Sequence, residues 1–139
     1  TGGQRGPTTP EGAWTSTSPL GQVEHPFNLV QLASAAGAVF VARWTALHVR
    51  QLEKAMSRAM QKDGFAFIEV LSPCPVGFGK SNDIGEGLDE MWLYRRNCYI
   101  DPDADLDGAG IEMKQDSEMI LGEFVDIERP LFRPSGAGD

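Results

Sequence analysis

The sequence has 139 residues, the length of one domain, with 41% hydrophobic residues and a formal net charge of −8. This hydrophobic content is ordinary for a globular protein and too high for a disordered chain. The acidic balance and the lack of a basic stripe argue against nucleic-acid binding, and no hydrophobic run approaches the roughly 20 residues that span a bilayer. Two cysteines in different segments do not form a disulfide framework, which favours a reducing cytoplasm.

The first 26 residues are rich in Gly, Pro, Thr and Ser and predict an irregular, turn-rich segment. The chain begins at Thr1 rather than at Met, so we expect a piece of a longer protein. Because glycines let backbone N–H groups approach an anion closely, Thr1, Gly2, Gly3 and Gln4 are candidate ligand-binding residues. A plain flexible turn is the alternative, because the segment matches neither a Walker loop nor the dinucleotide-binding fingerprint.

A strand–helix–strand unit follows this segment. Asn28 can cap a short helix that ends at Gly37, and residues 39–44 predict a strand buried on both faces. Hydrophobic residues at helical spacing predict a helix over residues 48–61, and residues 65–71 predict a second buried strand. This order indicates an α/β fold built on a parallel sheet with a right-handed crossover.

The pattern weakens in the C-terminal part of the chain. Residues 77–87 predict a loop, residues 88–99 a helix, and residues 119–127 a last strand. The acidic segment 101–110 is predicted to be flexible, and the residues from 130 onward form a predicted tail.

The acidic segment resembles the start of an EF-hand calcium loop. Counted from Asp103, the position that needs a bidentate Glu is Lys114. Counted from Asp101, that position is Glu112, but Leu106 stands where the loop needs glycine. Neither register works, so a solvated acidic linker is the preferred interpretation.

Cys74 is the candidate metal ligand. It lies in Ser72-Pro73-Cys74-Pro75, directly after a predicted parallel strand, and ligands gather at such strand ends in open α/β sheets. The flanking prolines favour an extended backbone, so a thiolate held there suits iron–sulfur ligation. A buried, inert cysteine is the alternative. Cys98 falls on the predicted helix 88–99, where packing is its expected role, and two cysteines do not complete a four-cysteine cluster.

Several segments, taken in order, resemble one family. They are Thr1-Gly2-Gly3-Gln4, Pro7-Thr8-Thr9-Pro10, Thr17-Ser18-Pro19-Leu20-Gly21, Glu24-His25-Pro26-Phe27, Ala35-Ala36-Gly37-Ala38, Phe40-Val41-Ala42-Arg43-Trp44, Gly64-Phe65, Phe67-Ile68-Glu69-Val70-Leu71-Ser72-Pro73-Cys74-Pro75 and Gly122-Glu123-Phe124-Val125-Asp126. In this order and spacing they resemble the β subunit of the thiamine diphosphate-dependent 2-oxoacid:ferredoxin oxidoreductases, closest to the 2-oxoglutarate type. The resemblance covers the first 80 residues well and residues 119–130 weakly.

The resemblance implies a parallel-sheet thiamine diphosphate-binding fold. Residues 1–80 would be the C-terminal half of the cofactor-binding domain, and residues 81–139 a C-terminal extension with an acidic linker and a tail. The segment from Thr1 to Gln4 would form the last wall of the thiamine diphosphate site, and Cys74 the fourth ligand of a [4Fe–4S] cluster. In that family the Mg²⁺ motif and the other three cluster cysteines lie upstream. We therefore expect no catalytic residue in this sequence and no activity from the isolated chain.

The implied reaction is the oxidative decarboxylation of a 2-oxoacid, with 2-oxoglutarate as the first candidate. Coenzyme A would take the acyl group, ferredoxin would take the electrons, and an α subunit would complete the active site. Two alternatives stay open. One is an oxidoreductase for pyruvate or a branched-chain 2-oxoacid, and the other is a non-catalytic interaction module or split product that only packs against a partner.

Overall fold

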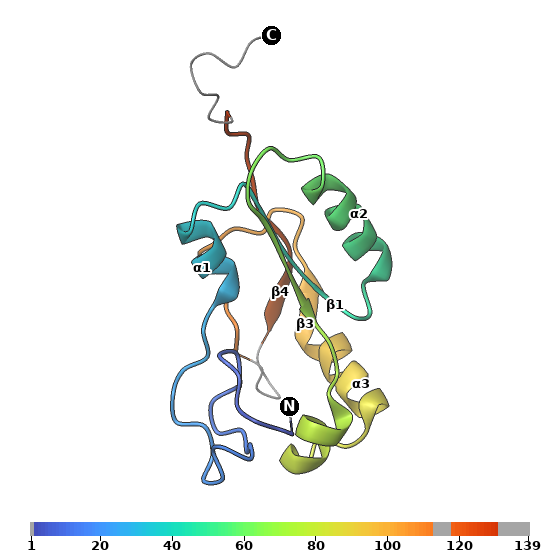
Figure 1. Ribbon diagram of the computed structural model, residues 1–139. Coiled ribbons are helices and arrows are strands. Elements are labelled where there is room, and N and C mark those ends of the chain that lie inside the picture. The colour runs from blue at the N-terminus through green and yellow to red at the C-terminus, as the bar shows by residue number, and fades with distance from the viewer. Residues whose placement is uncertain (1, 113–117, 131–139) are drawn as a thin grey trace.

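The computed structural model describes residues 2–112 and 118–130 (Figure 1). Its four strands form one sheet in the order β2-β1-β4-β3. The pairs β1–β2 and β3–β4 are parallel, whereas β4 runs antiparallel to β1. The elements in chain order are α1 (Leu29–Ala35), β1 (Phe40–Thr45), α2 (Val49–Ala59), β2 (Ala66–Leu71), the π-helical turn η1 (Pro75–Gly79), the 3₁₀ turn η2 (Lys80–Asn82), α3 (Gly87–Asn97), β3 (Cys98–Ile100) and β4 (Met119–Asp126).

The predicted α/β fold is confirmed, with a sheet that is mostly parallel. The predicted strand–helix–strand unit corresponds to β1, α2 and β2, and the last predicted strand is β4. The C-terminal strands β3 and β4 belong to the same sheet as β1 and β2. None of the helices within the described residues is long and apolar enough to cross a membrane. The tail predicted from residue 130 onward lies outside the described residues, except for Pro130.

The ends of α1 follow from local chemistry. Asn28 Oδ1 accepts a hydrogen bond from the backbone N–H of Gln31 at 3.2 Å, as an N-cap residue does. After the helix, Gly37 takes a φ of 89°, a left-handed conformation that glycine adopts without steric cost. The predicted helix start and stop are therefore confirmed.

Side-chain alternation along β1 builds a hydrophobic core on each face of the sheet. Val41 packs with the buried side of α1, including Val30. Phe40 and Ala42 point to the opposite face and pack with Ala55 of α2. Figure 1 shows α1 and α2 on opposite sides of the sheet. All six residues of β1 are buried, as predicted for a strand covered on both faces.

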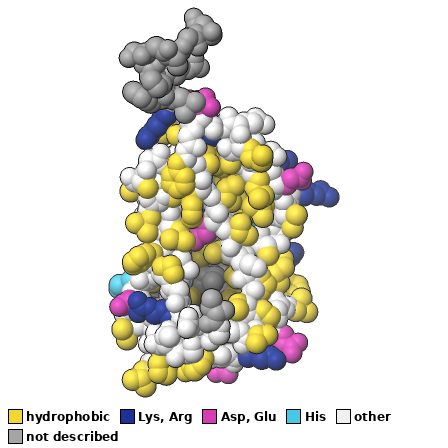
Figure 2. Space-filling model, viewed as in Figure 1, with side chains coloured by type: hydrophobic (Ala, Val, Ile, Leu, Met, Phe, Trp, Pro, Cys, Tyr) yellow, Lys and Arg dark blue, Asp and Glu magenta, His cyan; other side chains and the backbone are white. Residues whose placement is uncertain are grey.

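The second strand, β2, is less buried than its sequence predicts. Glu69 is its one buried residue, and Val70 is 44% exposed. The cause is its position, because β2 is an outer strand of the sheet and pairs only with β1 among the described strands. Hydrophobic side chains gather between α1 and α2 on the face that Figure 2 shows.

The acidic segment 101–110 packs against the core, so the prediction of a flexible segment is wrong. Ala109 is fully buried, and its carbonyl oxygen accepts a hydrogen bond from Asn28 Nδ2 at 2.5 Å. The next carbonyl, that of Gly110, accepts one from Arg43 Nη1 at 2.6 Å. Leu106 also contacts the α1 side of the core. The small and hydrophobic residues of the segment therefore fix it, while acidic side chains such as Asp105 stay exposed.

Candidate functional site

The N-terminal segment and the turn after β2 meet around one cavity of about 580 Å³. Gly2, Gly3 and Gln4 line one part of it, and Cys74 lines another. The structure thus brings together the two candidate sites that the sequence places about 70 residues apart. Thr1, the remaining candidate, lies outside the described residues.

Two glycines allow this close approach. A Cβ on Gly3 would stand 3.3 Å from the carbonyl oxygen of Gly77, and a Cβ on Gly77 would stand 3.6 Å from Gly3 Cα. The same Cβ on Gly77 would also stand 3.3 Å from Cys74 Sγ. A Cβ at Gly77 would be tight against the thiol and in ordinary contact with Gly3, so glycine here keeps room around the sulfur atom.

The N-terminal segment is held by the loop that follows it. The backbone N–H of Ser16 donates to the carbonyl oxygen of Gly3 at 2.9 Å, and the N–H of Arg5 donates to Thr17 Oγ1 at 3.0 Å. Within the described residues, the N–H groups of Gly3 and Gln4 have no acceptor. These N–H groups at the cavity wall are available to an anionic or polar ligand.

Cys74 presents its thiol on the surface of the same cavity. The side chain is exposed, which contradicts the alternative of a buried, inert cysteine. Its carbonyl oxygen accepts hydrogen bonds from the N–H groups of Phe78 at 2.9 Å and Gly79 at 3.0 Å. With φ −129° and ψ 71° the backbone of Cys74 is neither helical nor extended, so the extended conformation expected from the flanking prolines is not reached. The turn therefore holds an accessible sulfur atom at the carboxyl end of a parallel strand.

Glu90 of α3 is a residue of this site that the sequence analysis did not identify. It is 3% exposed, and its Oε2 accepts a hydrogen bond from the backbone N–H of Cys74 at 2.8 Å. Its Oε1 is buried and has no hydrogen-bond partner among the residues described. A Cβ on Gly79 would collide with this Oε1 atom. The carboxylate of Glu90 therefore packs against the turn that carries Cys74, in contact with Cys74 and Gly79.

Glu90 and Tyr94 lie one helical turn apart on α3. Both line a second cavity, of about 290 Å³, which Cys74 also borders. Burial first, and the negative charge of Glu90 second, raise the pKa of Tyr94 to about 12. Tyr94 thus stays a neutral hydrogen-bonding group at ordinary pH.

Cys98 has the packing role that the sequence predicts, but its predicted location is wrong. It begins β3 instead of lying on a helix, because α3 ends at Asn97. It packs against the core between α2 and the sheet, and burial raises the pKa of its thiol to about 11. A half-buried, protonated thiol packed against the core is unreactive. No group of three or more His, Cys, Asp or Glu side chains in the described part of the chain could hold a metal ion.

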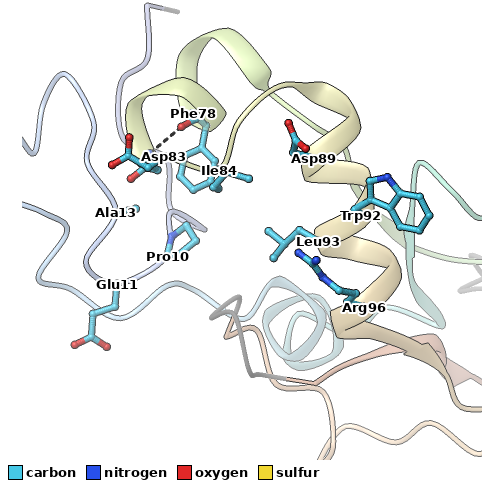
Figure 3. Close-up of a pocket in the computed structure, with 11 residues that line it drawn as sticks. Pro10, Glu11, Ala13, Phe78, Asp83, Ile84, Asp89, Trp92, Leu93 and Arg96 are labelled. Carbon is cyan, nitrogen blue, oxygen red and sulfur yellow. Dashed lines mark hydrogen bonds between the residues drawn. The ribbon is translucent and has the colours of Figure 1, made fainter.

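A third cavity, of about 390 Å³, lies between the N-terminal loop, η2 and α3. Leu93 and Arg96 extend from α3 toward it, and Ile84 lies across from them (Figure 3). Phe78 lines this cavity and the two that Cys74 borders, so η1 separates all three.

Comparison with known proteins identifies relatives of this chain. Residues 1–70 match the family described as thiamine pyrophosphate enzyme, C-terminal TPP binding domain. The 2-oxoglutarate synthase subunit KorB of Methanocaldococcus jannaschii is 40% identical over 133 residues, which are 95% of this chain and 48% of that protein. The 2-oxoglutarate oxidoreductase subunit KorB of Mycobacterium tuberculosis is 40% identical over 151 residues, covering 99% of this chain and 39% of that protein.

A solved structure shares the fold. The 2-oxoglutarate:ferredoxin oxidoreductase from Magnetococcus marinus, with 2-oxoglutarate, coenzyme A and succinyl-CoA bound, aligns with a TM-score of 0.69 and 23% identity. The alignment covers 91% of this chain and 43% of that chain. This chain spans about half the length of the curated relatives it matches.

Proposed function

The chain belongs to the thiamine pyrophosphate enzymes through their C-terminal TPP-binding domain, and from this premise we propose that it is part of the β subunit of a 2-oxoacid:ferredoxin oxidoreductase. The names of its relatives favour 2-oxoglutarate as the substrate. The resemblance noted in the sequence and the relatives agree on this family. Residues 1–80 would be the C-terminal half of the cofactor-binding domain, and residues 81–139 a C-terminal extension that supplies the strands β3 and β4.

One observation carries the proposal. The glycine-rich segment Gly2–Gln4 and the thiol of Cys74 line the same cavity. In the proposed enzyme a thiamine cofactor and an iron–sulfur cluster must lie within electron-transfer reach of each other. A single cavity that joins an anion-accepting backbone to an exposed thiol meets that need.

The N-terminal residues fit the diphosphate end of thiamine diphosphate. Gly3 and Gln4 offer backbone N–H groups without an acceptor in the described structure, and a Cβ on Gly2 would meet nothing within 4 Å. Bare backbone with free N–H groups suits an anion. The Mg²⁺ ligands and most of the other cofactor contacts would come from residues outside this sequence.

Cys74 fits a cluster ligand. Its thiol is exposed, its backbone is fixed on both sides, and Gly77 leaves space beside the sulfur atom. Three further cysteine ligands would have to come from residues outside this sequence, because a [4Fe–4S] cluster needs four. When bound, thiamine diphosphate supplies the electron sink for decarboxylation and the cluster accepts electrons one at a time. The residues of this chain would hold the two groups at a fixed separation.

Coenzyme A, ferredoxin and an α subunit complete the proposal. Coenzyme A and ferredoxin appear in the name of the Magnetococcus marinus structure, and an α subunit is the expected counterpart of a β subunit. Both cysteines of the described chain are free thiols, which supports a reducing cytoplasm as the location.

The experiment uses the full-length β subunit that contains this chain, assembled with its α subunit. We expect Cys74→Ser to abolish ferredoxin reduction and alter the cluster spectrum while thiamine diphosphate binding stays largely intact, because serine removes a single cluster ligand. Cys98→Ala is the matched control and should retain ferredoxin reduction, since Cys98 only packs in the core. Wild-type ferredoxin reduction by Cys74→Ser would contradict the ligand assignment.

A further inference from the structure

We propose that Glu90 is the positioning residue of Cys74, and that its carboxylate lowers the reduction potential of the iron–sulfur cluster that Cys74 binds. The positioning role stands on the geometry of this chain alone. The effect on the potential rests on the proposed function.

The positioning role follows from the contacts of the carboxylate. Glu90 Oε2 accepts the N–H of Cys74 at 2.8 Å, and the carbonyl oxygen of Cys74 accepts the N–H groups of Phe78 and Gly79. Both backbone groups of Cys74 are therefore fixed, one by α3 and the other by η1. Glu90 Oε1 abuts Gly79, at a position where any Cβ would collide with it. The turn thus leaves room for this carboxylate at Gly79.

Holding the backbone of Cys74 with a buried carboxylate costs folding free energy. Glu90 is 3% exposed, it forms no ion pair with any described residue, and its Oε1 is left without a hydrogen bond. Burying a charge with an unsatisfied oxygen destabilises a fold. Positioning alone could be achieved by a neutral acceptor, so the negative charge itself points to a further role.

That role is electrostatic. An iron–sulfur cluster becomes more negative by one charge when it accepts an electron, and a buried negative charge nearby disfavours this step. Glu90 is one hydrogen bond away from the backbone of the proposed ligand. It also occupies the N–H of Cys74, which then cannot donate to a cluster sulfur atom and stabilise the reduced form. Both effects lower the reduction potential.

Two substitutions separate the charge from the hydrogen bond. Glu90→Gln removes the charge but keeps an acceptor at the same reach, whereas Glu90→Asp keeps the charge but is one methylene shorter. Glu53→Gln is the matched control, because Glu53 is an exposed carboxylate on α2. The variants are made in the full-length β subunit assembled with its partner. The readouts are the midpoint potential of the cluster, by redox titration with electron paramagnetic resonance, and hydrogen exchange of the peptide that contains Cys74.

We expect Glu90→Gln to shift the midpoint potential to a more positive value with unchanged cluster content, and Glu53→Gln to leave it at the wild-type value. We expect Glu90→Asp to speed the exchange of the Cys74 amide by about tenfold, because it loses a charge-assisted hydrogen bond. A wild-type potential in Glu90→Gln overturns the electrostatic role, and wild-type exchange in Glu90→Asp overturns the positioning role.

A different variant tests whether Cys74 is a cluster ligand at all. If Cys74→Ser retains the complete cluster, Cys74 is not a ligand and the effect on the potential is overturned with it. The hydrogen exchange of Glu90→Asp still decides the positioning role in that case.

Discussion

At the scale of single residues, the most buried charged side chain among the described residues is that of Arg43. It is fully buried on β1 and donates from Nε to Glu69 Oε2 of β2 at 2.6 Å. Its Nη1 donates to the carbonyl oxygen of Gly110 at 2.6 Å, and it lies over the ring of Phe124 at 5.6 Å. One side chain thus joins two strands and the acidic segment on the α1 face of the sheet.

We expect Glu69→Gln to lower the free energy of unfolding by about 3–5 kcal/mol, because it leaves the Arg43 charge buried without its counter-ion. Replacing both residues, with Arg43→Met and Glu69→Leu together, should cost less than Glu69→Gln alone, since no buried charge remains. Urea denaturation followed by circular dichroism measures both values.

The control makes the same chemical change at the surface. Glu24→Gln removes the negative charge of the exposed ion pair with Arg5, and we expect a change within about 1 kcal/mol. Equal losses for Glu69→Gln and Glu24→Gln would mean that burial of the Arg43 pair has no energetic consequence.

At the scale of elements, Asn28 couples α1 to the acidic segment 101–110. Its Oδ1 caps the helix through the N–H of Gln31, and its Nδ2 donates to the carbonyl oxygen of Ala109. One side chain therefore fixes a helix start and a loop that is 81 residues away along the chain.

Asn28→Ala removes both hydrogen bonds, and we expect a loss of about 1–3 kcal/mol from the cap and the bond to Ala109 together. Asn28→Ser keeps a good cap but cannot reach Ala109, so its loss should be smaller. Both variants should be cleaved faster within residues 101–110 in limited proteolysis, because the segment loses an anchor. Wild-type cleavage in Asn28→Ser would show that the bond to Ala109 does not hold the segment.

The sequence predicted those elements whose signals lie within the elements themselves. Asn28 and Gly37 mark the ends of α1, and the helical spacing of hydrophobic residues marks α2. Segment 101–110 was predicted wrongly because its acidic residues dominate its composition. The residues that fix it, Asn28 and Arg43, are 81 and 67 positions distant from their partners.

The same distinction applies to the site. Cys74 is marked by its flanking prolines, and the segment Gly2–Gln4 by its glycines, so both could be selected from the sequence. No neighbouring residue in the sequence singles out Glu90, because its role depends on how α3 packs beneath the turn after β2. That packing is a tertiary contact, and a single sequence does not reveal it.

At the scale of the whole molecule, β2 lies at one edge of the sheet. Its second edge pairs with no strand of the described chain, and hydrophobic side chains gather on the face between α1 and α2 (Figure 2). Phe65, directly before the strand, is 49% exposed. An open strand edge beside exposed hydrophobic residues promotes association between copies of a chain.

We therefore expect the isolated 139-residue chain to self-associate as its concentration rises, and we expect Val70→Lys to weaken this association. Val70 is 44% exposed on β2, so a lysine there puts a charge on the open strand at little cost in packing. Leu20→Lys is the control, because Leu20 is 99% exposed in the N-terminal loop and lies outside the sheet. Light scattering across a concentration series should show a lower mean mass for Val70→Lys than for Leu20→Lys. If the wild-type chain stays monomeric at high concentration, the edge of β2 is protected within these 139 residues, and no covering strand from a longer protein is needed.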